Sequence, residues 1–268
     1  MITGINIIRN CLSTGYPFLE SILSAIPLCD SYSVNDGGST DGTLEALQEL
    51  SESYPKVKVY QIPDTESVRW DCVSDQINAM IKDVPDRSWI FLGNADELLH
   101  EDDIIALLDY FKPWEHRIMR FIRKEITYNW SALGSDVYHP ARMARKVDGM
   151  RQDWNAYGGD EFLFNDGWED PKRKLVSPFT IYHFYNMFPV NQIRKLENDA
   201  LHLSPGDEKR VATWKRLKDS SISSVKATKV YPRLPALMRG LAGLQKYYIR
   251  KELFDVKWVE ELTGLKYL

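Results

Sequence analysis

Apolar positions in the first 111 residues follow two alternating spacings. Short apolar or β-branched runs predict strands, and apolar side chains that recur every three or four residues predict helices. The predicted strands cover 4–8, 32–35, 57–62 and 89–92, and the predicted helices lie within 18–26, 44–50, 73–84 and 101–111. Alternation at this length predicts the α/β class, with a mostly parallel sheet and helices on both faces.

The pattern changes after about residue 115. Longer mixed strands are predicted at 117–128 and 176–184, and the Gly, Asp, Asn and Trp-rich stretch 129–175 between them reads as long functional loops rather than core. Beyond Pro189 the spacing becomes helical, and from 232 to 251 leucines alternate with basic residues. A helical segment therefore follows the α/β part.

Composition narrows the class. The 268 residues are enough for one large domain with an appendage, and 34 basic against 38 acidic residues give no overall electrostatic basis for binding nucleic acid. Three cysteines without CxxC spacing argue against a zinc knuckle and a disulfide framework. With no signal peptide or apolar run of membrane-spanning length apparent, we expect a cytoplasmic protein.

Two acidic turns each follow a predicted strand. The first is Val-Asn-Asp-Gly-Gly-Ser-Thr-Asp-Gly-Thr at 34–43, and the second is Asn-Ala-Asp-Glu at 94–97. Ligands of open α/β sheets bind beyond the carboxyl ends of the strands. The two turns therefore predict one site for a nucleotide and a metal ion, although Gly and Asp are also ordinary turn and cap residues.

These segments resemble the inverting, GT-A-type glycosyltransferases of family 2. The resemblance covers about residues 2–190 and rests on the strand at residue 4, the turn 34–43, the stretch before Asn78 and the segment 91–97. The corresponding family motifs are V-D-D-G-S-T-D-G-T and L-D-A-D-D or L-D-A-D-E. The resemblance implies a GT-A catalytic domain at 1–190, with a nucleotide-sugar-binding half (1–111) and an acceptor-binding half (112–190), before a helical extension (191–268).

On the donor side, the resemblance implies that Asp36 accepts a hydrogen bond from the base and that Asp96 binds Mn²⁺ or Mg²⁺. Asn35 and Asn94 stand where the family has aspartate, so the charge available to a metal is lower and metal dependence is less certain; Glu97 is an extra ligand or a supporting acid. The other expected donor contacts are Asn10, Gly38, Asp41, Arg69, Asn78, Asn94 and Ala95.

On the acceptor side, the resemblance places the catalytic base at Asp160, with Glu161 as the second candidate. The alternative for Asp160 is a solvated loop residue. His183 is implied as a further metal ligand, which favours Mn²⁺ over Mg²⁺; its alternative is a core histidine. One of Trp130, Trp154 and Trp168 is expected to stack on an acceptor sugar, although tryptophan also fills cores.

The letters of 158–162, Gly-Gly-Asp-Glu-Phe, also spell the signature of diguanylate cyclases. That domain needs a two-helix, metal-binding half upstream, whereas the upstream half here alternates strands and helices. We therefore treat the match as coincidence.

The expected function is transfer of a sugar, from a UDP-sugar by preference, to a carbohydrate or glycolipid hydroxyl with inversion, as in polysaccharide biosynthesis. The alternatives are a retaining GT-A enzyme and a non-catalytic protein that binds nucleotide sugar or glycan. For 232–251 we expect packing on the catalytic domain first, and peripheral contact with the inner membrane face as the alternative. Periodicity fixes neither the sugar, the acceptor nor the oligomeric state.

Overall fold

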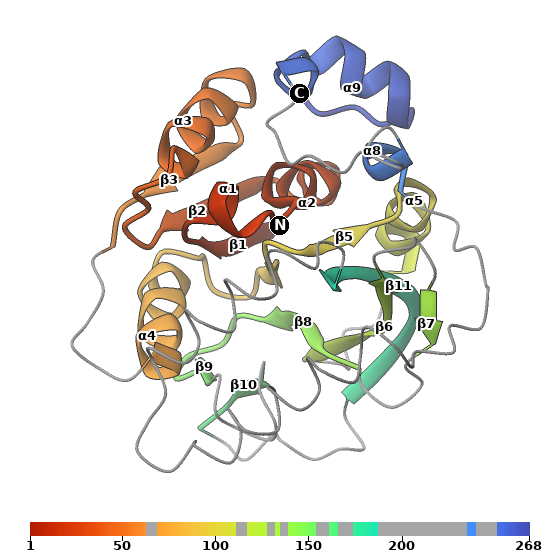
Figure 1. Cartoon of the computed structure of the whole chain (residues 1–268). Coiled ribbons are helices and arrows are strands. Elements are labelled where there is room, and N and C mark those ends of the chain that lie inside the picture. The colour runs from red at the N-terminus through yellow and green to blue at the C-terminus, as the bar shows by residue number, and fades with distance from the viewer. Residues whose placement is uncertain are drawn as a thin grey trace, which may run out of the picture.

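A helical segment follows most strands of the N-terminal half, as the apolar spacing predicts. The computed structural model describes residues 1–62, 69–110, 117–127, 132–134, 139–153, 161–165, 174–186, 235–239 and 251–268. The first four strands are β1 (Ile2–Ile8), β2 (Ser31–Asp36), β3 (Val57–Tyr60) and β4 (Trp89–Leu92). The helical elements between them are α1 (Cys11–Thr14), α2 (Phe18–Ala25), η1 (Ile26–Leu28), α3 (Thr43–Ser53) and α4 (Arg69–Lys82) (Figure 1).

These four strands pair in the order β3-β2-β1-β4, and each pair is parallel. The chain builds outward from β1 to β2 and β3, and then returns to the other side of β1 to form β4. Such a reversal opens a crevice beyond the carboxyl ends of the strands on either side of it. The two acidic turns follow β2 and β4, which flank β1.

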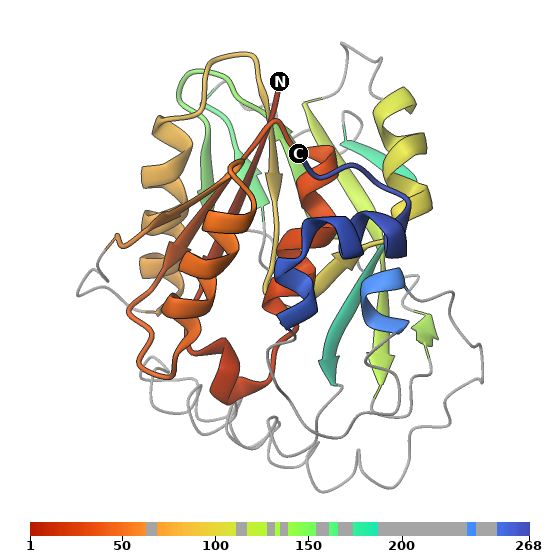
Figure 2. The same ribbon diagram turned by 90° about the horizontal axis from the view of Figure 1, so that it is seen from above.

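Helices cover both faces of the parallel half (Figures 1 and 2). On one face, α2 and α3 bury Ile22 and Leu47 in a cluster that includes Val34 of β2. On the other face, α4 buries Ile77 in a second cluster with Ile5 of β1. The alternation of side chains along β1 supplies both clusters, because successive residues of a strand point to opposite faces. The predicted α/β class is confirmed.

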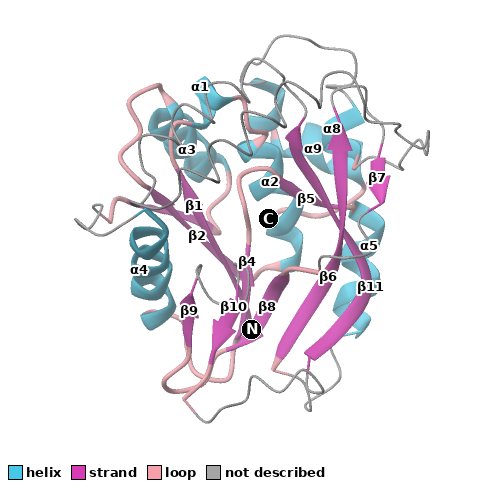
Figure 3. Cartoon of the chain, turned by 60° about the horizontal axis from the view of Figure 1, so that its bottom comes forward, coloured by secondary structure: helices cyan, strands magenta, loops and turns pink. Residues whose placement is uncertain are grey.

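The sheet continues beyond β4 with mixed pairing (Figure 3). The next elements are β5 (Glu97–Leu99), α5 (Glu101–Tyr110), β6 (Ile118–Thr127), β7 (Ala132–Gly134), β8 (Ala141–Arg145) and β11 (Lys174–Asn186). The order is β4-β8-β6-β11-β5, with β7 paired to β6, and β6–β11 is the parallel pair in this part of the described nine-stranded sheet. The predicted strands at 117–128 and 176–184 are confirmed.

The interpretation of 129–175 as loops rather than core was wrong for part of that stretch. Strand β8 lies within the sheet between β4 and β6, and its Met143 is fully buried. The strands β9 (Arg151–Asp153) and β10 (Glu161–Leu163) pair with each other, and Phe162 is also fully buried. These strands are short and each contains a charged residue, so they lack an apolar run and the sequence pattern did not reveal their burial.

The described C-terminal residues pack on the N-terminal half. They form α8 (Ala236–Arg239), η4 (Lys251–Phe254) and α9 (Val256–Thr263), and Leu237 and Val259 join the same apolar cluster as α2 and α3. The Tyr54 hydroxyl donates to the Leu253 carbonyl at 3.0 Å. Within 235–239, the apolar side chains Leu237 and Met238 are thus buried in packing. No helix in the described ranges has the length and apolarity to cross a membrane.

Candidate functional site

Two loops at the carboxyl ends of β1 and β2 are bonded to each other. The Asn10 backbone N–H donates to Ser39 Oγ at 2.9 Å, and the Thr40 N–H donates to Asn10 Oδ1 at 2.9 Å. Asn10 adopts a left-handed conformation, with φ of 48°. Its side-chain oxygen therefore fixes the shape of the acidic turn, where the sequence predicted a donor contact.

Asp41 organises the end of the same turn. Its Oδ2 accepts from the Ser13 N–H at 2.7 Å, and its Oδ1 accepts from the Thr43 hydroxyl at 2.6 Å and the Thr43 N–H at 3.1 Å, at the start of α3. Burial acts to raise the pKa of Asp41, but these hydrogen bonds outweigh it and hold the pKa below the usual value. Both oxygens of Asp41 are therefore engaged within the protein.

Asp36 differs from Asp41 because one of its oxygens is left over. Its Oδ2 accepts from the N–H groups of Gly38 and Ser39 at 3.1 and 2.9 Å, and φ of +81° at Gly38 gives the turn its shape. Its Oδ1 is buried and has no hydrogen-bond partner among the described residues. An unsatisfied buried acceptor costs about 1–3 kcal/mol, so this oxygen is suited to a ligand N–H.

The second turn starts at Gly93, directly after β4. Tyr32 of β2 passes beneath it, and a Cβ at position 93 would lie 2.5 Å from the Tyr32 hydroxyl oxygen. Ser21 of α2 donates from Oγ to the Asn94 carbonyl at 2.5 Å, and the Phe184 N–H donates to the Asp96 carbonyl at 2.7 Å. The turn is thus fixed between α2 and β11, with Ala95 packed against the apolar core.

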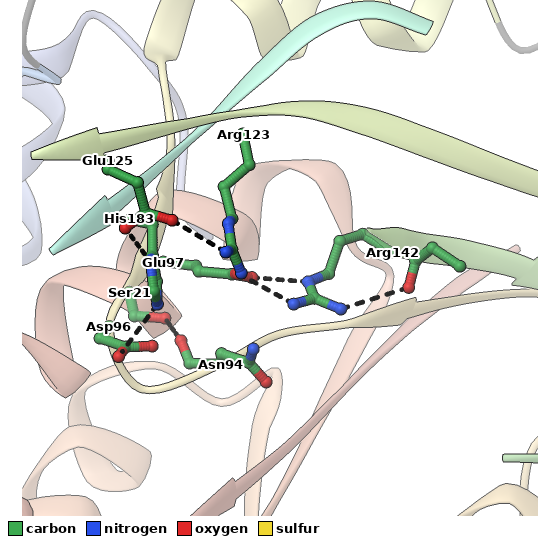
Figure 4. Close-up of polar contacts among 9 residues, drawn as sticks. Ser21, Asn94, Asp96, Glu97, Arg123, Glu125, Arg142 and His183 are labelled. Atoms are coloured by element: carbon green, nitrogen blue, oxygen red, sulfur yellow. Dashed lines mark hydrogen bonds and ion pairs between the residues drawn. The ribbon is translucent and has the colours of Figure 1, made fainter. Parts of the chain in front are cut away.

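The structure brings the two predicted metal ligands together. Strands β5 and β11 are antiparallel and place His183 opposite Glu97. His183 Nε2 lies 3.3 Å from Asp96 Oδ2, and both residues are buried (Figure 4). On the other side of the ring, His183 Nδ1 lies 2.6 Å from Glu125 Oε2 of β6. Arg123 Nη2 lies 2.8 Å from Glu125 Oε1.

The neighbouring charges determine the protonation of His183 and Glu125. Burial lowers the pKa of His183, but Asp96 and Glu125 outweigh burial and raise the pKa to about 9. Burial raises the pKa of Glu125, but the hydrogen bond from His183 and the charges of His183 and Arg123 bring it below the usual value. With no metal bound, His183 is therefore a cation at neutral pH.

Arg142 of β8 is a site residue that the sequence analysis missed. It is fully buried, and its Nε and Nη2 donate to the two oxygens of Glu97 at 2.5 and 2.8 Å. In the amide orientation that satisfies both of its atoms, Asn94 accepts from Arg142 Nη2 at 2.8 Å and donates to the Gly93 carbonyl at 3.2 Å. Glu97 and Asn94 are thus engaged with Arg142. The available signal was an arginine flanked by small and apolar residues, Ala-Arg-Met-Ala.

The Asp96–His183 pair fits a divalent cation. Two neighbouring ligands of an octahedral ion with bonds of about 2.1 Å lie roughly 3.0 Å apart, close to the observed 3.3 Å. Within the described ranges no group of three or more His, Cys, Asp or Glu residues could hold a metal. Of the residues that the structure describes, Asp96 and His183 would thus supply two ligands.

The remaining predicted residues either are bonded within the protein or have side chains outside the described set. Asn78 of α4 donates to the Gln152 carbonyl at 2.9 Å and accepts from the Gln152 N–H at 2.8 Å, so its amide holds β9 against α4. Arg69 begins α4 and Glu161 pairs with Asp153 through the β10 backbone, but their side chains are outside the described set. Asp160, Trp130, Trp154 and Trp168 also lie outside the described residues.

The buried ion pair between Arg142 and Glu97 predicts that Arg142→Met strongly destabilises the protein. Loss of the guanidinium leaves the Glu97 carboxylate buried without its countercharge, which should lower the free energy of unfolding by about 3–5 kcal/mol. Urea denaturation measures this. The double variant Arg142→Met/Glu97→Leu should recover much of the loss. The exposed pair Lys257–Glu261 provides the control, and Lys257→Met should change little. An Arg142→Met effect as small as the control would contradict the analysis.

The raised pKa of His183 predicts that the stability of the metal-free protein depends on pH. The pKa of His183 in the folded protein, about 9, lies above its usual value of 6.5, so its contribution to stability is complete below about pH 6.5 and is lost as the pH rises through 9. Urea denaturation in EDTA near pH 6, 8 and 10 should show the excess stability of the natural protein over His183→Gln shrinking toward high pH. A difference that grows with pH would refute the assigned charge state.

No family model matches the chain, and no curated protein matches it. Among solved structures, residues 1–349 of S. aureus TarS share 13% identity, with 84% of this chain and 73% of that one covered and a TM-score of 0.45. Another S. aureus TarS structure shares 14% identity, with 83% of this chain and 44% of that one covered and a TM-score of 0.44. The mannosyltransferase PcManGT of Pyrobaculum calidifontis, in complex with GDP-Man and Mn²⁺, shares 16% identity. This match covers 97% of this chain and 87% of that one, with a TM-score of 0.45. One of the three similar structures is thus that of a mannosyltransferase.

Proposed function

We propose that this chain is a glycosyltransferase that takes a sugar from a nucleotide-sugar donor and transfers it to a hydroxyl group of a carbohydrate or glycolipid. One observation carries the proposal. The two turns of the sequence motif lie beyond β2 and β4. One holds a buried carboxylate oxygen with no hydrogen-bond partner in the described part of the chain, and the other holds a carboxylate–imidazole pair. None of the three cysteines forms a disulfide, in agreement with a cytoplasmic location.

Asp36 would recognise the base. Its Oδ1 is a pure acceptor to which none of the described residues donates, while its Oδ2 is held by two backbone N–H groups, so the carboxylate is fixed before a ligand arrives. An N–H between two carbonyl groups, such as N3–H of uracil, suits one carboxylate oxygen in line. This chemistry supports a UDP-sugar as the donor.

Asp96 and His183 would hold a divalent cation beside the donor diphosphate. When bound, such an ion neutralises the negative charge that develops on the leaving diphosphate. A neutral imidazole together with one carboxylate favours Mn²⁺ over Mg²⁺. Arg142 neutralises the charge of Glu97 at the adjacent position, and the Asp96 carboxylate contacts His183.

On the acceptor side we assign the base to Asp160, which lies between β9 and β10 in sequence, with Glu161 as the second candidate. Its carboxylate would take the proton of the acceptor hydroxyl as the oxygen attacks the anomeric carbon. The new C–O bond forms as the bond to the diphosphate breaks, and the bonding electrons leave with the diphosphate. Attack opposite the leaving group gives inversion.

A non-catalytic nucleotide-sugar-binding protein is the second candidate, because Asn35 and Asn94 replace family aspartates. Both asparagines have partners here. Asn35 donates to Gln76 Oε1 at 2.9 Å and accepts from the Ile62 N–H at 2.6 Å, and the Asn94 amide faces Arg142. The replacements therefore fit local hydrogen-bonding needs and do not by themselves favour loss of catalysis.

Calorimetric titration of UDP, GDP and dTDP tests the donor site, with Mn²⁺, Mg²⁺ or EDTA present. We expect binding of UDP that depends on the metal and is lost in Asp96→Ala, because that variant removes a charged ligand. Asp36→Asn presents an N–H₂ group to the base and should weaken binding about 10–100-fold. Asp86→Asn is the control and should leave binding unchanged, because Asp86 is an exposed acid outside both acidic turns. If no nucleotide binds under any condition, the proposed donor site is refuted.

Asp160→Asn separates the enzyme from the binding protein. Loss of the general base should reduce transfer by about 10²–10⁴-fold while nucleotide affinity is unchanged. Glu161→Gln in parallel shows which of the two acids serves as the base. Product detection by mass spectrometry, across donors and carbohydrate acceptors, provides the measurement. If the natural protein binds a nucleotide sugar but yields no product with any donor and acceptor pair, the binding protein is the better description.

A further inference from the structure

The second nitrogen of His183 faces a half-buried carboxylate, that of Glu125, which the donor site itself does not use. Strands β6 and β11 run parallel and place Glu125 beside His183 in register. The two side chains meet at 2.6 Å, between His183 Nδ1 and Glu125 Oε2. Glu125 and His183 are both largely shielded from solvent, with side-chain exposures of 17% and 11%. The contact is therefore short and protected from competing water.

Arg123 holds the same carboxylate from its other side. Its Nη2 lies 2.8 Å from Glu125 Oε1, so each oxygen of Glu125 has a different partner. A carboxylate fixed at both oxygens cannot rotate without losing one contact. The order Arg123–Glu125–His183–Asp96 thus forms a continuous chain of charged contacts across β6, β11 and the turn before β5 (Figure 4).

The contact between Glu125 and His183 Nδ1 bears on which tautomer His183 adopts. A neutral imidazole carries one proton, and the partner of one nitrogen determines which nitrogen keeps it. Both nitrogens of His183 face a carboxylate, but Glu125 Oε2 is the nearer one, at 2.6 Å from Nδ1 against 3.3 Å between Nε2 and Asp96 Oδ2, so the single proton of a neutral ring is held on Nδ1. The lone pair of Nε2 then points to the side where Asp96 Oδ2 lies at 3.3 Å. Such a carboxylate also makes the imidazole a stronger ligand.

We propose that Glu125, itself held by Arg123, is a positioning residue that fixes the orientation and tautomer of His183 so that Nε2 and Asp96 Oδ2 form a preorganised pair of ligands for a divalent cation. The inference rests on the proposed function and adds a residue that the motif resemblance does not reach. Glu125 lies outside both acidic turns, in a strand that the apolar pattern marks only as mixed.

The first test is the binding of Mn²⁺ to the full chain in the presence of UDP, followed by the paramagnetic resonance of free Mn²⁺. Glu125→Ala should weaken binding about 10–100-fold, the usual effect of losing the carboxylate behind a ligating histidine. Glu125→Gln keeps an oxygen that can accept from Nδ1–H and should lose less affinity. Unchanged affinity in Glu125→Ala would overturn the proposal.

A matched control separates positioning from general stability. Glu101 is a buried carboxylate that also lies beside a histidine, with Oε2 3.6 Å from His100 Nδ1, and it accepts from the Ala236 N–H at 2.9 Å. Glu101→Ala should lower the unfolding midpoint without changing Mn²⁺ affinity. If Glu101→Ala weakens Mn²⁺ binding as much as Glu125→Ala does, the effect is one of stability and the proposal fails.

The tautomer provides a readout that does not need a metal. Nitrogen-15 spectra of the histidine rings, recorded in EDTA at a pH where His183 is neutral, should show the proton on Nδ1 in the natural protein. In Glu125→Ala the tautomer should shift toward Nε2–H, which can donate to Asp96. A proton on Nε2 in the natural protein would overturn the proposal whatever the metal does.

The outcomes also separate this inference from the proposed function. Loss of Mn²⁺ binding in Asp96→Ala, together with full binding in Glu125→Ala, refutes the role of Glu125 and leaves the donor site intact. Absence of Mn²⁺ binding by the natural protein with any nucleotide refutes the metal site, and the tautomer spectra still decide whether Glu125 orients His183.

Discussion

The balance of charge in a water-poor part of the sheet is the constraint on which the candidate site depends. Three acids, Asp96, Glu97 and Glu125, meet three basic partners, His183, Arg142 and Arg123. Buried charges persist only when they are paired and hydrogen-bonded. With His183 protonated the group is neutral. Exchange of its proton for a divalent cation would leave one positive charge in excess, next to where a diphosphate is proposed to bind.

The sheet topology explains how residues so distant in the sequence come to share this site. The parallel half places the turns after β2 and β4 at one edge, on either side of β1. The antiparallel pairing of β5 with β11 then brings His183 next to Asp96, and the parallel pairing of β11 with β6 adds Glu125. The mixed half of the sheet thus contributes His183 and Glu125 to the candidate site, next to the acidic turns of the parallel half.

The neighbours of Asn35 and Asn94 explain why these residues differ from the motifs that the two turns resemble. Asn35 is fully buried. Its amide oxygen accepts from the Ile62 N–H, and its amide nitrogen donates to Gln76 Oε1 and the Ile62 carbonyl. A carboxylate at this position would have no N–H group to donate. Asn94 can donate to the Gly93 carbonyl and accept from Arg142 with one amide. An aspartate at position 94 would place a second acid on a guanidinium already bonded to Glu97. The identities of these residues follow from donor and acceptor needs within the protein.

The sequence by itself determined the parallel half, because apolar spacing and strand-end turns are local signals, and it selected Asp36, Asp96 and His183 as candidates. It did not reveal β8 or the roles of Arg142, Glu125 and Arg123. Their charges interrupt the apolar pattern, and their partners lie 45 and 58 residues away for the Arg142–Glu97 and His183–Glu125 contacts. Only the tertiary structure decided that Asp41 and Asn78 are bonded within the protein while one oxygen of Asp36 is left over, because hydrogen-bond satisfaction depends on which strands become neighbours.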